Sequence, residues 1–169
     1  MKLEEESMSN LGIDTIMLDT SFCIRLMDKY DALHQNALEY FKYFLAEKIT
    51  MHISTIVVAE YAVMDDPANL PLNNLQIESF DFIDAKTAGA FHAHLKGNQS
   101  SIQGYNRRLI ANDVKILAQI KNKKIDGLIS KDIKSSRDYI DPLIESNLLQ
   151  VKFINLNIPL SQTLGKLFL

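Results

Sequence analysis

The chain has 169 residues, of which 47% are hydrophobic and 23% are charged, and its formal net charge is −3. These values predict one compact domain and argue against tight, non-specific binding of DNA. The single cysteine, Cys23, excludes an intrachain disulfide framework and a cysteine-rich zinc site. An acidic amino terminus and the lack of a long apolar run argue against a secretory signal and a membrane helix, so we expect a cytoplasmic protein with no membrane contact.

Residues 1–12 are polar and are expected to form a flexible tail ahead of a single domain over residues 13–169. Within that domain, short apolar runs predict strands, and apolar residues three and four positions apart predict helices. In chain order these are strand 15–18, helix 22–27 capped by Ser21, helix 33–46, strand 50–53, helix 55–65 capped by Ser54, strand 76–83, helix 85–95, helix 109–120, strand 125–130, helix 135–148 and strand 151–154. This alternation predicts an α/β fold, a three-layer α/β/α sandwich around a mainly parallel sheet of roughly five strands.

Four acidic residues interrupt this apolar pattern. Asp19 follows the first predicted strand, Glu60 lies in the helix face that also carries Val57 and Val63, Asp113 lies on the helical stripe of Ile110 and Leu117, and Asp132 follows the fourth strand. A carboxylate in an apolar setting loses hydration and either neutralises or finds a cation. Parallel strands end at one edge of a sheet, where ligands collect, and we expect all four acids to reach that edge. A shared divalent metal site is the simplest explanation.

The segments around these acids resemble the motifs of the PIN domain family of metal-dependent nucleases, and in particular its small bacterial toxin-like members. The segments are Leu18-Asp19-Thr20-Ser21, residues 53–60, residues 112–118 and residues 128–132. Each motif is weak alone, but their order, spacing and predicted secondary structure form a strong joint signal. Ser130 stands where threonine is commoner in the family, and the stretch 98–108 together with the tail makes the chain longer than a minimal toxin of this kind.

The resemblance implies an endoribonuclease that hydrolyses RNA phosphodiester bonds with one or two Mg²⁺ or Mn²⁺ ions. In this chain the metal-binding and catalytic residues would be Asp19, Glu60, Asp113 and Asp132. A hard cation that keeps several waters suits a few carboxylates at an open sheet edge. The resemblance also implies a homodimer and a toxin–antitoxin pair with an antitoxin protein as partner.

Other polar residues are assigned supporting roles. The hydroxyl or amide residues next to the acids are Ser21, Asn112 and Ser130. Candidate contacts to RNA phosphates are Arg25, Arg107, Arg108 and Lys115. A charge near a helix end is more often a solvated residue favoured by the helix dipole, so each of these cations also has that simpler interpretation.

Alternative functions remain open at this point. A PIN-like domain without catalysis could bind RNA or a protein, although retention of all four acids disfavours it. A receiver-like phospho-acceptor domain needs an adjacent acidic pair near the first strand, whereas Asp14 and Asp19 lie at opposite ends of that strand. A haloacid-dehalogenase-like phosphatase needs an aspartate two residues after the first, and Ser21 stands there. Taken singly, Asp19 can be a helix cap, Glu60 a solvent-reaching residue and Asp132 a turn residue.

Overall fold

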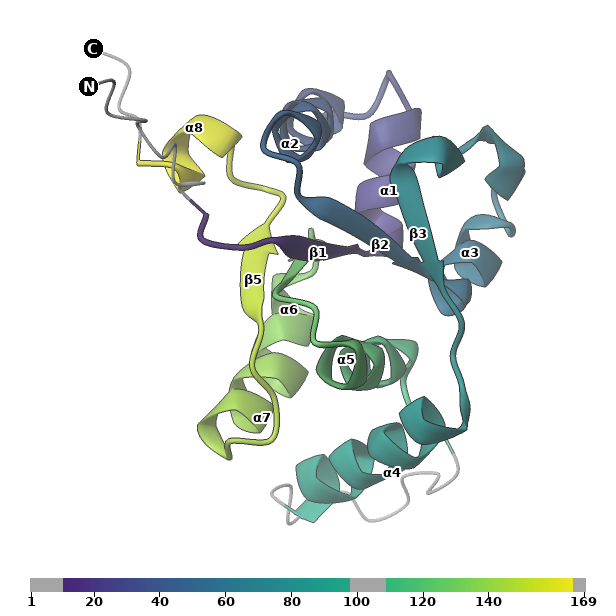
Figure 1. Ribbon diagram of the computed structural model, residues 1–169, viewed down its shortest axis with the longest axis vertical. Coiled ribbons are helices and arrows are strands. Elements are labelled where there is room, and N and C mark those ends of the chain that lie inside the picture. Colours follow the sequence, from purple (N-terminus) through teal and green to yellow (C-terminus); the bar gives the residue numbers. More distant parts are fainter. Residues whose placement is uncertain (1–10, 98–108, 166–169) are drawn as a thin grey trace, which may run out of the picture.

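The computed structural model describes residues 11–97 and 109–165. In this part of the chain a parallel sheet of five strands lies between two layers of helices (Figure 1). The strands are β1 (Thr15–Leu18), β2 (Thr50–Ser54), β3 (Leu75–Glu78), β4 (Gly127–Ser130) and β5 (Lys152–Asn155). All neighbouring pairs are parallel. The predicted three-layer α/β/α class is therefore confirmed.

The order of the strands, β3-β2-β1-β4-β5, creates a switch point at the centre of the sheet. The chain builds outward from β1 to β3, then returns to the opposite side of β1 to form β4 and β5. Leu18 at the end of β1 is in register with Ile129 near the end of β4. In open parallel sheets, the crevice beyond such a pair of strands is where ligands bind.

Helices cover both faces of the sheet (Figure 1). The first layer contains α1 (Thr20–Met27), α2 (His34–Ala46) and α3 (Thr55–Tyr61), with the short α8 (Leu160–Thr163) against α2. The second layer contains α4 (Phe82–Gly97), α5 (Asn112–Lys123) and a composite helix made of α6 (Ile133–Ser135), the π turn η3 (Ser136–Ile140) and α7 (Asp141–Glu145). Two 3₁₀ turns, η1 (Pro67–Asn69) and η2 (Leu72–Asn74), connect α3 to β3. No helix in the described ranges is long and apolar enough to cross a membrane.

The hydrophobic core follows the sheet. The central strands β1 and β4 are buried apart from Thr15, which is partly covered. Phe22 of α1 and Tyr40 and Phe44 of α2 are fully buried, and the ring centroids of Phe22 and Tyr40 lie 6.5 Å and 6.1 Å from that of Phe44. Aromatic contacts of this kind add to the free energy gained from burial. These contacts in the core therefore hold α1 against the sheet, next to the end of β1.

Several predicted boundaries are wrong, and each has a local cause. Strand 76–83 ends at Glu78, because Asp81 and Asp84 each accept a hydrogen bond from the other's backbone N–H and so start α4 at Phe82. The helix predicted over 55–65 ends at Tyr61, and the side chains of Val63 and Met64 are 85% and 67% exposed. The buried face of α3 thus ends at Tyr61, several residues before Pro67, which was expected to end the helix.

Other differences occur at the ends of elements. The first helix begins at Thr20 with Asp19 at its N-cap position, so Ser21 lies inside the helix and does not cap it. Ser54 does cap α3, as predicted, by accepting a hydrogen bond from the Ile56 N–H. Leu109, predicted to be part of a helical stripe, precedes α5 and is 65% exposed. Of the tail predicted over 1–12, residues 1–10 lie outside the described residues, and Leu11 is buried in the core.

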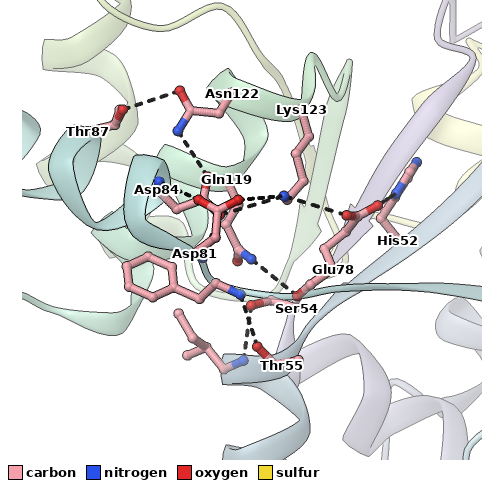
Figure 2. Close-up of polar contacts among 12 residues, drawn as sticks. His52, Ser54, Thr55, Glu78, Asp81, Asp84, Thr87, Gln119, Asn122 and Lys123 are labelled. Atoms are coloured by element: carbon pink, nitrogen blue, oxygen red, sulfur yellow. Dashed lines mark hydrogen bonds and ion pairs between the residues drawn. The ribbon is translucent and has the colours of Figure 1, made fainter.

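A partly buried polar network joins the edge of the sheet to α4 and α5 (Figure 2). The Lys123 ammonium lies 3.6–3.9 Å from carboxylate oxygens of Glu78, Asp81 and Asp84. Asp84, which is 1% exposed, also accepts a hydrogen bond from the Asn122 side chain at 2.9 Å. Buried charges of one sign need such a counter-charge, since each ionised group has lost its hydration. Lys123 therefore fastens the carboxyl end of α5 to α4 and β3.

We predict that Lys123→Met lowers the free energy of unfolding by about 1–3 kcal/mol, because it leaves the buried Asp84 and its acidic neighbours without their cation. Urea denaturation monitored by circular dichroism measures this difference. Lys134→Met is the control, since it removes an exposed i,i+4 ion pair to Asp138 and should leave the urea midpoint close to that of the wild type. Equal midpoints for the two variants would contradict a stabilising role for the network.

Candidate active site

The four predicted acidic residues come from four different elements that meet at the switch point. Asp19 follows β1 directly, and its backbone N–H donates to the Ile129 carbonyl of β4 at 3.2 Å. Asp132 lies two residues beyond the end of β4. Glu60 lies in the last turn of α3, and Asp113 in the first turn of α5. Asp132 is exposed, whereas the other three acids are half-buried.

Asp19 is held by two serine hydroxyls. Its Oδ2 accepts hydrogen bonds from Ser21 Oγ at 2.9 Å and from Ser130 Oγ at 2.8 Å. The backbone beyond β4 closes around the same serines, because the Lys131 N–H donates to Ser21 Oγ and the Asp132 N–H donates to Ser130 Oγ, both at 3.0 Å. Ser21 and Ser130, predicted as supporting residues, thus join the ends of β1 and β4 through the carboxylate of Asp19.

Both carboxylate oxygens of Glu60 are occupied by hydrogen-bond donors. Thr20 Oγ1 donates to Oε2, and Asn112 Nδ2 donates to Oε1 at 2.8 Å. Glu60 therefore ties α3 to the first residues of α1 and α5. Asn112 was predicted as a supporting residue, whereas Thr20 was not. The sequence marks Thr20 only by its position between Asp19 and Ser21. It does not reveal that Thr20 bonds to Glu60, which lies 40 positions away.

Ser135 joins the remaining two acids and was also missed by the sequence analysis. Its Oγ donates to Asp113 Oδ2 at 2.5 Å, and its backbone N–H donates to Asp132 Oδ1 at 3.0 Å. The second contact is an N-cap interaction, in which Asp132 caps α6. The Asp132-x-x-Ser135 spacing in the sequence is typical of a helix start. Only the tertiary structure brings the Ser135 hydroxyl to Asp113.

Asp19, Asp113 and Asp132 line one cavity, together with Ser130 and Ser135, above an apolar floor. The floor is formed by Ile116, Leu117, Leu128, Ile140 and Phe153. Burial raises the pKa of Asp113, the Ser135 hydrogen bond opposes this rise, and the charges of Asp19, Asp132 and Glu60 add to it. The negative charges are thus close enough to repel one another.

The donor set fits a hard divalent cation. Asp19, Asp113 and Asp132 each keep one carboxylate oxygen that accepts no hydrogen bond from the described residues, namely Oδ1, Oδ1 and Oδ2. Three such oxygens with room for water are ligands that Mg²⁺ and Mn²⁺ accept. In the side-chain arrangement described here, however, no group of three or more acidic, histidine or cysteine residues is already placed to hold one ion. Small movements of the aspartates toward a cation would be required.

The structure describes two of the four residues predicted to contact RNA phosphates. Lys115 donates to Asn112 Oδ1 at 3.4 Å. It therefore lies beside Asn112, whose side chain donates to Glu60. Arg25 is turned back onto its own helix and the following loop, since Nη1 donates to the Ser21 carbonyl and Nε lies 3.6 Å from Asp31. Arg107 and Arg108 lie outside the described residues.

Comparison with known proteins supports the fold at low sequence identity. Neither family models nor curated proteins match the chain. VapBC2 of Rickettsia felis, solved bound to a DNA fragment from its promoter, is 20% identical, with a TM-score of 0.56 over 82% of this chain and 98% of the other. FitAcB of Neisseria gonorrhoeae is 17% identical, with a TM-score of 0.59 over 83% and 97%. This chain has the PIN-like α/β fold of these structures. DNA-bound VapBC of Salmonella typhimurium is also similar, at 17% identity, a TM-score of 0.52 and coverage of 82% and 97%.

We predict that Asp113→Asn raises the melting temperature at pH 7 by a few degrees, where about 1 kcal/mol corresponds to roughly 2–4 °C for a chain of this size. The pKa of Asp113 is raised in the fold, so its ionised form destabilises the native state increasingly as the pH rises through that pKa. The advantage of asparagine should therefore shrink as the pH falls toward the ordinary value of 3.8.

Thermal denaturation followed between pH 7.5 and pH 4.5 measures this effect. Glu145→Gln is the control, because it neutralises an exposed carboxylate at the end of α7 and should change stability by less than about 0.5 kcal/mol. A lower melting temperature for Asp113→Asn than for the wild type at pH 7 would show that the ionised group stabilises the fold instead.

Proposed function

We propose that this protein is a metal-dependent endoribonuclease that hydrolyses RNA phosphodiester bonds, with Mg²⁺ or Mn²⁺ held by Asp19, Asp113 and Asp132. The observation that carries the proposal is the cavity at the β1–β4 switch point, which these three aspartates line together and where each keeps one oxygen that accepts no hydrogen bond from the described residues. The PIN-like fold and the four matching motifs support the same conclusion. A non-catalytic domain has no need for this arrangement.

The acids divide into two roles in this proposal. Asp19, Asp113 and Asp132 are metal ligands, directly or through water, and can accommodate one ion or two. Each oxygen of Glu60 accepts one hydrogen bond, from Thr20 or from Asn112, so Glu60 orders these two residues beside the cavity. A carboxylate oxygen can accept a second partner, so Glu60 can also bind metal or orient the attacking water.

The bound metal would supply a Lewis acid and a water of lowered pKa for attack on phosphorus. The residues of this chain would hold the metal and orient its ligands. Ser21 and Ser130 fix the direction of the Asp19 carboxylate, and Ser135 fixes Asp113 and Asp132. The apolar side chains that line the cavity make it less polar than water, which strengthens electrostatic interactions there.

RNA would approach an otherwise acidic molecule through local cations. Lys115, whose ammonium donates to Asn112 Oδ1, is a described cation near the acids that could contact a phosphate. Arg107 and Arg108, just before α5 in the sequence, are further candidates. Arg25 is a weaker one, because the Ser21 carbonyl and Asp31 already hold its guanidinium.

We also propose that the protein acts in the cytoplasm as the toxin of a toxin–antitoxin pair and forms a homodimer. Two of the similar solved structures are VapBC assemblies bound to DNA, which supports a partner protein of this kind. A neighbouring gene for a small DNA-binding protein, and co-purification of its product with this chain, would support the pairing. Sedimentation of the isolated chain as a monomer would contradict the homodimer.

The proposal predicts that Mn²⁺ stabilises the wild type and supports cleavage of an RNA panel, and that Asp19→Ala loses both properties. Saturating metal at about 100 times its dissociation constant stabilises a protein by roughly 2.7 kcal/mol, which a thermal shift assay detects easily. Cleavage by Asp19→Ala should fall by more than about 100-fold, beyond the 10–100-fold loss typical of residues that only support a ligand.

Glu145→Ala serves as the control for this experiment, since it removes an exposed acid far along α7. It should cleave RNA and respond to Mn²⁺ like the wild type. If Mn²⁺ produces neither a thermal shift nor cleavage in the wild type, the chain is better described as a non-catalytic PIN-like binding domain.

A further inference from the structure

Ser135 contacts the carboxylates of two proposed metal ligands, Asp113 and Asp132. Its hydroxyl donates to Asp113 on α5, and its backbone N–H donates to Asp132 in the β4–α6 loop. Each bond occupies one carboxylate oxygen and leaves the other one unbonded to the described protein. The two aspartates are thus held in a fixed relation by a single residue.

The π turn that follows Ser135 explains why its side chain faces α5. In an uninterrupted α-helix each residue turns by about 100°, so Ile140 would point roughly 140° and Leu143 roughly 80° away from Ser135. A π turn inserts one extra residue, which reduces these angles to roughly 40° and 20°. Ser135 therefore shares one face of the composite helix with two residues that anchor it in the core.

The observed burial agrees with this geometry. Leu143 is fully buried and Ile140 is 3% exposed. Ser135 and Ile140 line the same cavity as Asp113. The backbone stays right-handed and helical through the junction, with φ and ψ of −59° and −40° at Ser135 and −58° and −47° at Asp141. The π turn thus redirects the side chains without breaking the helix.

We propose that Ser135 is a positioning residue of the active site, and that the π turn Ser136–Ile140 aims its hydroxyl at Asp113 so that Asp113 and Asp132 bind the same metal ion. This inference rests on the proposed metal-dependent function. Ser135 lies outside the four acidic motifs. A π turn next to it agrees with the frequent occurrence of such turns at functional sites.

The role of the hydroxyl can be separated from that of the backbone. Ser135→Ala removes the bond to Asp113 but keeps the N–H that caps Asp132, so α6 retains its N-cap interaction. Ser135→Thr restores a hydroxyl at the same position. Ser161→Ala is the control, because Ser161 is a half-buried helical serine of α8, which packs against α2 in the other helix layer.

The test is a Mn²⁺ titration of the full chain, read both as a thermal shift and as RNA cleavage. Ser135→Ala should raise the half-saturating Mn²⁺ concentration by about 10-fold or more, as expected for a residue that orients a metal ligand, with little change in the KM for RNA. Ser135→Thr should lie close to the wild type, and Ser161→Ala should be indistinguishable from it.

Three outcomes would overturn the inference, and they are distinguishable. If the wild type responds to Mn²⁺ and Ser135→Ala responds at the same concentrations, the hydroxyl does not position the ligand. If Ser135→Thr is as defective as Ser135→Ala, the effect comes from packing. If the wild type itself shows no response to Mn²⁺, the proposed metal-dependent function fails and the role of Ser135 fails with it.

Discussion

Repulsion among four carboxylates is the constraint on which this site depends. The acids gather at one edge of the sheet, where partial burial strengthens their mutual repulsion. The structure meets this constraint with neutral donors from neighbouring elements, namely Thr20, Ser21, Asn112, Ser130 and Ser135. Each donor belongs to a different segment from the acid that it serves, apart from Ser21. Satisfying the carboxylates therefore also cross-links α1, α3, α5, β4 and α6.

The position of α5 links the site to the rest of the fold. Its first turn carries Asn112 and Asp113, which contact Glu60 and Ser135. Its last turn carries Asn122 and Lys123, which lie in the polar network of β3 and α4 (Figure 2). The buried apolar face between them, including Leu117 and Ile120, packs in the core. Fixing both ends of the helix limits its sliding and rotation, and this keeps Asp113 at the cavity.

The strands and the acids could be predicted from the sequence because both leave local signals. Apolar runs mark β1 and β4; Asp19 follows β1 directly, and Asp132 lies two residues beyond β4. The π turn leaves no such signal, since the apolar spacing over 135–148 is compatible with a regular helix. Ser135 and Thr20 look like ordinary helix-start residues, and their partners lie 22 and 40 positions away. Only tertiary packing decides these contacts, just as the reciprocal hydrogen bonds of Asp81 and Asp84 decide where β3 gives way to α4.

The hydrogen bonds also rank the acids as ligands. A cation at the oxygens of Asp19, Asp113 and Asp132 that accept no hydrogen bond does not share them with a donor of the described protein. At Glu60 a cation shares its oxygen with the hydrogen bond from Thr20 or Asn112, which weakens that oxygen as a ligand. In the proposed function, Asp19, Asp113 and Asp132 are therefore the first ligands of the metal. The observed contribution of Glu60 is to hold the first residues of α1 and α5 in place.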